Sequence, residues 1–120
     1  MPYIRVSSAK KVPPEAEQAL VDALGLALSN VPGKEPKWTM VELNDGRPMF
    51  FGGEKQEDMV FLATQYVGHF PFQRKRSYVQ AACKAVHEVL GTPIDRICVT
   101  ISEHENWGAL GDFRDIYFAE

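Results

Sequence analysis

The sequence has few cysteines and no long hydrophobic run. Its 120 residues include two cysteines, Cys83 and Cys98, and no CxxC pair. Both fall in predicted regular elements, which favours reduced, buried thiols and a cytoplasmic protein over a disulfide scaffold. The longest strongly apolar stretch, MVFLA at 59–63, is too short to cross a bilayer. We therefore expect no membrane association.

An excess of positive charge is also missing. Lysine and arginine number 13 against 16 aspartate and glutamate residues, for a net charge of −3. This balance gives no electrostatic reason to expect a nucleic acid or an anionic membrane as partner. Basic residues interrupt the first segment, so we expect no secretory signal.

Motifs for metal or phosphate binding are likewise missing. The three histidines lack a spacing such as HExxH, and no glycine-rich phosphate loop is present, since GG at 52–53 is too short a signal. The sequence predicts no metal and no cofactor.

The chain is long enough for one domain, 1–120, with its own hydrophobic core. Residues 2–7 alternate as a strand does, with Ile4 and Val6 on one face. Pro2 heads this strand, which is one of the few strand positions that accept proline.

Two helices are predicted from apolar spacing. The first begins at Pro13 and Pro14, repeats apolar residues at helical intervals, and ends before Pro32 and Gly33. The second runs over 74–91, where Gly91 is placed to end it with a positive φ.

Further strands are predicted over 37–43, 59–67 and 96–102, with a last short strand at 116–118. The order is β-α-β twice, and each unit requires parallel pairing of its two strands. The predicted fold class is α/β (α+β): a four-stranded mixed sheet with both helices on one face. Because the other face needs covering, oligomerisation is expected.

Several short motifs occur together in a characteristic order. Pro2 follows Met1 directly; PGK stands at 32–34, PMFFGG at 48–53 and RSY at 76–78; PIDRICV at 93–99 leads into the fourth predicted strand. In these features the chain resembles the tautomerase superfamily, in particular its longer members similar to macrophage migration inhibitory factor. The likeness spans essentially the whole chain.

The resemblance implies a symmetric homotrimer and an active site around Pro2. It also implies that Met1 is removed, which leaves a free secondary amine. In an apolar pocket the charged form of that amine is desolvated and its pKa falls, so that it could act as a general base near pH 7.

The same resemblance suggests residues that bind a small carboxylate-bearing substrate. Lys34, at the pocket rim in the family, could hold a carboxylate or carbonyl oxygen. Arg74 and Arg76 are similar to the arginine pairs that grip substrate carboxylates in some members. The remaining candidates are aromatic side chains for the walls and a position on the fourth strand: Tyr66, Trp107, Phe113 and Thr100.

Three functions stay open. The first is a tautomerase or isomerase that moves a proton in keto–enol 2-oxo acids, such as arylpyruvates, with Pro2 as base. The second is a hydratase or dehalogenase of short unsaturated acids, in which Glu103 or Glu105 would polarise a water. The third is a non-catalytic binding trimer of the same fold.

Overall fold

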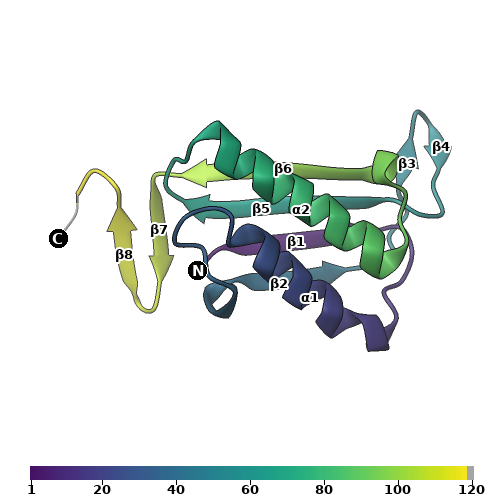
Figure 1. Ribbon diagram of the computed structural model, residues 1–120, viewed down its shortest axis with the longest axis horizontal. Helices are drawn as coiled ribbons and strands as arrows, with labels where there is room; N and C mark the ends of the chain where they lie inside the picture. The colour runs from purple at the N-terminus through teal and green to yellow at the C-terminus, as the bar shows by residue number, and fades with distance from the viewer. Residues whose placement is uncertain (119–120) are drawn as a thin grey trace.

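The computed structural model describes residues 1–118 and contains one four-stranded sheet (Figure 1). Its strands, in spatial order, are β2 (Met40–Asn44), β1 (Tyr3–Ser8), β5 (Val60–Val67) and β6 (Ile97–His104). β1 pairs in parallel with β2, and β5 in parallel with β6, while β1 and β5 run antiparallel at the centre. The predicted mixed sheet of two β-α-β units is confirmed.

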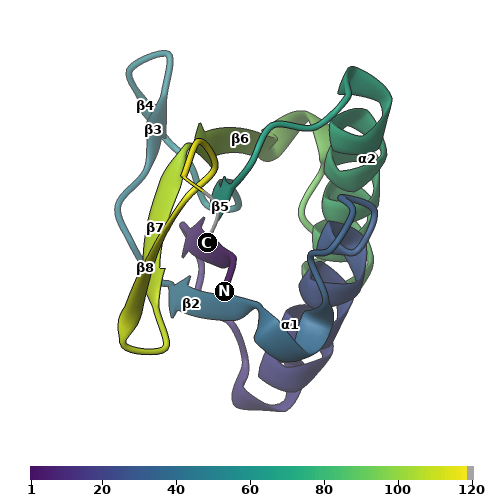
Figure 2. The same cartoon turned by 90° about the vertical axis from the view of Figure 1, so that its left-hand side faces the viewer.

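Two long helices complete the units: α1 (Pro14–Leu28) and α2 (Phe72–Leu90). Pro14 occupies the first turn of α1, where a missing N–H costs nothing. Gly91 ends α2 with φ 76°, as predicted, and its N–H bonds to the carbonyl of His87. Figure 2 shows both helices on the same side of the sheet.

The core lies between this helix layer and the sheet. Ile4 and Val6 of β1 are buried, as their alternation predicts. Tyr78 of α2 is also fully buried, and its hydroxyl shares a hydrogen bond with Thr64 of β5. Other buried side chains of the helix–sheet interface are Leu20, Leu24, Leu28, Leu62, Ala82 and Val86.

The opposite face of the sheet is not covered by any element of residues 1–118. It presents Arg5, Cys98 and Thr100, all exposed. The prediction of a buried Cys98 is therefore wrong for the single chain, because Cys98 occupies the outward position of the alternation in β6. Cys83 is half-buried, and both thiols are free.

Two hairpins extend from the ends of the sheet (Figure 1). β3 (Phe50–Phe51) and β4 (Glu54–Lys55) form one, and β7 (Asn106–Ala109) and β8 (Asp112–Asp115) form the other. The predicted strand at 116–118 is wrong, since the last strand ends at Asp115. Two short 3₁₀ turns, η1 (Pro36–Trp38) and η2 (Ile94–Arg96), precede β2 and β6.

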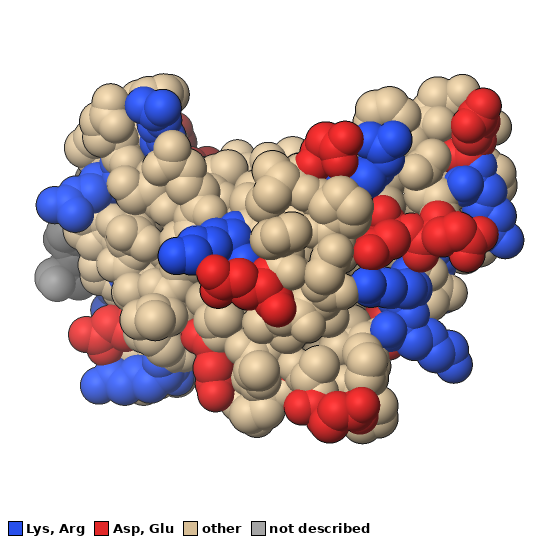
Figure 3. All heavy atoms as spheres, turned by 45° about the vertical axis from the view of Figure 1, so that its right-hand side comes forward, with Lys and Arg blue, Asp and Glu red and all other residues tan. Residues whose placement is uncertain are grey.

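The predicted element boundaries shift by a few residues. The strand expected over 37–43 begins only at Met40, because Pro36 starts η1. Helix α2 begins at Phe72, two residues earlier than predicted. None of the helices described is long and apolar enough to span a membrane. Blue and red side chains are interspersed on the face in Figure 3, with no continuous patch of one sign.

Candidate active site

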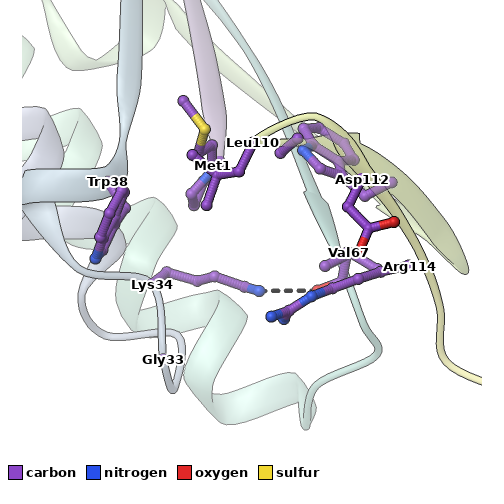
Figure 4. A pocket seen from close by; sticks show the side chains of 11 residues that line it. Met1, Gly33, Lys34, Trp38, Val67, Leu110, Asp112 and Arg114 are labelled. Atoms are coloured by element: carbon purple, nitrogen blue, oxygen red, sulfur yellow. Dashed lines mark hydrogen bonds between the residues drawn. The ribbon is translucent and has the colours of Figure 1, made fainter. Parts of the chain in front are cut away.

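A pocket of about 520 Å³ lies where β1 begins, and the β7–β8 hairpin forms one of its walls. This volume is within the range of small-molecule sites. The pocket brings together the chain start, the loop after α1 and the hairpin (Figure 4). Its lining residues are Met1, Pro2, Gly33, Lys34, Trp38, Val67, Trp107, Ala109, Leu110, Asp112 and Arg114.

Pro2 is buried at the pocket wall. Its carbonyl accepts the N–H of Met40 at 2.8 Å, which joins the start of β1 to β2. The terminal amine in the structure belongs to Met1. Its pKa is lowered by burial first, and then by the positive charges of Lys34 and Arg114.

Lys34 reaches the pocket from the turn that follows α1. Its ammonium donates a hydrogen bond to the carbonyl of Val67 at 2.9 Å and lies over the rings of Tyr66 and Phe70, 5.3 and 5.2 Å from their centroids. Burial, followed by the charge of Arg114, lowers the pKa of Lys34. Within residues 1–118, no carboxylate lies at ion-pair distance from its ammonium.

The hairpin contributes the second cation. Trp107 pairs with Arg114, and Ala109 with Asp112, so that these four side chains share the face toward the pocket. Figure 4 shows Arg114 and Lys34 directed into the same part of the pocket. Phe113 pairs with Gly108 on the other face of the hairpin and is exposed. It does not line the pocket of the single chain.

Two tryptophans provide apolar wall. Trp107 is half-buried, and the ring of His104 packs edge-on against it at 5.6 Å. Trp38 comes from η1 on the opposite side and remains 47% exposed. The pocket therefore has a cationic part at Lys34 and Arg114 and an apolar part between the indole rings.

Tyr66 and Glu103 lie behind the pocket. The Tyr66 hydroxyl donates to the Glu103 carboxylate at 2.9 Å, and burial followed by this bond raises the pKa of Tyr66. Glu103 also accepts the N–H of Phe70 and the ammonium of Lys75. Burial alone would raise the pKa of Glu103, but these hydrogen bonds outweigh it and lower the pKa. Both oxygens of Glu103 are thus engaged with protein groups.

The structure does not bring the other candidates to this pocket. Arg74 and Arg76 are exposed on α2, whereas Lys75 between them binds Glu103 at 3.2 Å. Thr100 is exposed on the uncovered face of the sheet. The pocket of the single chain thus unites three of the predicted site residues: Pro2, Lys34 and Trp107.

Sequence reasoning missed Trp38, Asp112 and Arg114. No strand is predicted over 106–115, because the two strands there have only four residues each and contain few apolar residues. Phe113 was singled out by its aromatic ring, while in a strand its two neighbours face the other way. Recognising residues 106–115 as a hairpin would have pointed to Arg114.

The charges of the pocket define what it can bind. Two cations and one lining carboxylate, Asp112, favour a small anion over a metal ion. Among the residues described, no group of three His, Cys, Asp or Glu side chains could hold a metal.

No protein-family model and no curated protein matches this chain, but solved structures do. MIF2 from Leishmania major is 18% identical with a TM-score of 0.85, covering 95% of this chain and 97% of its own. A fused 4-OT solved as a symmetric trimer is 18% identical with a TM-score of 0.76, covering 85% of each chain. N1, of the cis-3-chloroacrylic acid dehalogenase family, is 21% identical with a TM-score of 0.81, covering 92% of this chain and 81% of its own.

At these sequence identities the similarity shows a shared fold and no shared activity. The three proteins are members of the tautomerase superfamily, and each matches this chain over most of its length. The β-α-β repeat, the mixed sheet and the helices on one face are shared with them. The chain therefore has the tautomerase fold, as its motifs led us to expect.

Proposed function

We propose that the protein is a keto–enol tautomerase of small 2-oxo acids, with the amine of Pro2 as general base after removal of Met1. One observation carries the proposal. Pro2 lines a pocket together with Lys34 and Arg114, and burial and these two charges lower the pKa of the Met1 amine beside it. After removal of Met1 we expect the same charges to lower the pKa of the Pro2 amine. A neutral amine beside two cations suits the removal of a proton from an anionic substrate.

The reaction needs one base and stabilisation of one oxyanion. The neutral Pro2 amine would take a proton from C3 of the keto acid, leaving an enolate whose negative charge is on the C2 oxygen. Protonation of that oxygen gives the enol, and the reverse steps restore the ketone. In this proposal Lys34 and Arg114, which line the same pocket, bind the carboxylate and the developing oxyanion.

We also propose that the protein is a homotrimer. The uncovered face of the sheet, with exposed Cys98 and Thr100, needs a partner, and the fused 4-OT of the same fold is a symmetric trimer. In such an assembly Arg74, Arg76, Phe113 or Thr100 could reach the pocket of a neighbouring copy. Analytical ultracentrifugation should give three times the chain mass; a monomer at all concentrations would contradict this.

The free thiols of Cys83 and Cys98 lead us to propose a cytoplasmic location. Fractionation of cells that express the untagged protein tests it. Recovery of the protein from a secreted or membrane fraction would contradict this location.

The central experiment first establishes by intact mass that Met1 is absent, and then follows the phenylpyruvate enol by ultraviolet absorbance. Wild type should speed conversion to the ketone. Pro2→Ala should lower kcat/KM by about 100-fold or more. A glycine inserted before Pro2, which turns its nitrogen into an amide, should abolish the activity. Unchanged turnover in both variants would disprove the role of Pro2.

One observation favours a second candidate, a hydratase or dehalogenase. Asp112 places a carboxylate in the pocket that could polarise a water, whereas Glu103 is fully engaged elsewhere. Halide release from cis-3-chloroacrylate, lost in Asp112→Asn, would support this reaction over tautomerisation. Binding of 2-oxo acids without any turnover would instead indicate the non-catalytic trimer.

A further inference from the structure

The tip of the β7–β8 hairpin has an unfavourable residue. Leu110 and Gly111 form the two-residue connection, with φ of 55° and 76°. Turns with positive φ at both positions strongly prefer asparagine or aspartate followed by glycine. Leu110 is the one residue other than glycine with positive φ in the part of the chain that the structure describes. Local backbone preference therefore does not explain the leucine.

Packing of the protomer does not explain it either. The side chain of Leu110 is 79% exposed, so it contributes little to the hydrophobic core. A leucine that is both exposed and conformationally disfavoured suggests a function that needs an apolar group at this point.

The position of Leu110 indicates that function. It lines the pocket together with Trp38 and Met1, whereas Lys34 and Arg114 supply the cationic part (Figure 4). A substrate whose carboxylate binds the two cations would extend its other end toward Leu110 and the indole rings.

We infer that Leu110 is a specificity-determining residue that contacts the apolar substituent on C3 of the 2-oxo acid. The inference rests on the proposed function for the nature of the substrate, and it assigns to Leu110 the contact by which acids with an apolar group on C3 are preferred. Small acids such as pyruvate leave this contact unused.

The test measures binding rather than turnover. Two unreactive acids with the same carboxylate, 3-phenylpropanoate and propanoate, are titrated calorimetrically into protein that lacks Met1. Leu110→Asn suits the turn but removes the apolar group, and Leu110→Met keeps an apolar group. Ile94→Asn, at an exposed position of η2 that does not line the pocket, is the matched control.

Wild type should bind 3-phenylpropanoate more tightly than propanoate. Leu110→Asn should raise the melting temperature of the protein. It should weaken the binding of 3-phenylpropanoate by about 10-fold and leave the affinity for propanoate unchanged. Leu110→Met and Ile94→Asn should keep the wild-type preference. Equal preference in wild type and Leu110→Asn would overturn the inference, as would a loss of the oligomer in Leu110→Asn, which would assign Leu110 to a contact between copies.

These outcomes can be separated from failure of the proposed function. If wild type shows the expected binding preference but converts no enol, the contact at Leu110 stands and the enzyme proposal fails. If wild type converts the enol but Leu110→Asn keeps the preference for 3-phenylpropanoate, the enzyme proposal stands and the role of Leu110 is disproved.

Discussion

Lys10 and Lys34 lie near opposite ends of β1, and each donates a hydrogen bond to a backbone carbonyl. Lys10 bonds to the carbonyl of Leu90 and forms an ion pair with Asp58 at 3.0 Å. Asp58 also accepts the hydroxyl of the buried Thr92 at 2.7 Å. Lys34 bonds to the carbonyl of Val67, has no carboxylate at ion-pair distance in residues 1–118, and faces Arg114 instead.

The presence or absence of a carboxylate partner distinguishes a lysine that stabilises the fold from a lysine that is available to bind an anion. At Lys10, the carboxylate of Asp58 compensates the ammonium and ties the segment after β1 to the end of α2. At Lys34, two cations lie side by side in one part of the pocket, which destabilises the empty site but favours an incoming anion. The predictions below test this contrast.

The largest effect is expected for Lys34→Met, which keeps the apolar stem and removes the charge. Losing a charged hydrogen bond to the substrate carboxylate should lower kcat/KM for phenylpyruvate about 10- to 100-fold. The melting temperature should change little, because loss of the hydrogen bond to Val67 is offset by relief of the repulsion from Arg114. A kcat/KM within twofold of wild type would contradict the binding role of Lys34.

Lys10→Met should show the opposite pattern. Removing a partner of Asp58 should lower the free energy of unfolding by about 1 kcal/mol, a modest value because both side chains remain about one-third exposed. The value of kcat/KM should stay at the wild-type level. Urea unfolding and steady-state kinetics on the same preparation measure both quantities. A variant that keeps its stability but loses activity would contradict the structural role of Lys10.

Arg114→Met should change the pH dependence. A general base acts when neutral, so kcat/KM should rise with pH as the Pro2 amine loses its proton. The charge of Arg114 lowers the pKa of the Met1 amine in this pocket. After removal of Met1 we expect Arg114→Met to raise the pKa of the Pro2 amine and so move the rising limb of the pH profile to higher pH. Lys34→Met should move the limb further, because Lys34 is the larger of the two charge effects. If the rising limb of kcat/KM against pH stays in place in both variants, the group that titrates is not an amine in this pocket.

The smallest effects are expected for Arg74→Ala and Arg76→Ala. Both side chains are exposed and do not line the pocket of the single chain, so kcat/KM should fall by less than Arg114→Met lowers it. A larger fall for either variant would show that the pocket is completed by arginines of a neighbouring copy.

The β-α-β units were readable from the sequence because their signals are local. The alternation of Ile4 and Val6 predicts a strand, and Gly91 marks the end of α2 through its backbone freedom. Pro2 and Lys34 were identified as site residues through motifs. The β7–β8 hairpin was not predicted because each strand has only four residues, too few to establish a strand period, and its inward side chains line the pocket rather than the core.

By itself, the sequence determined the two strand–helix–strand units and the proline at the head of β1, because periodicity and the backbone limits of proline and glycine act over a few residues. Only the tertiary structure decided which cations surround that proline. The PGK motif pointed to Lys34 in the turn after α1, but no motif pointed to Arg114 in the last strand, and no local pattern implies that the two meet. Their meeting depends on how the chain packs over long range, and that packing gives the pocket its charge.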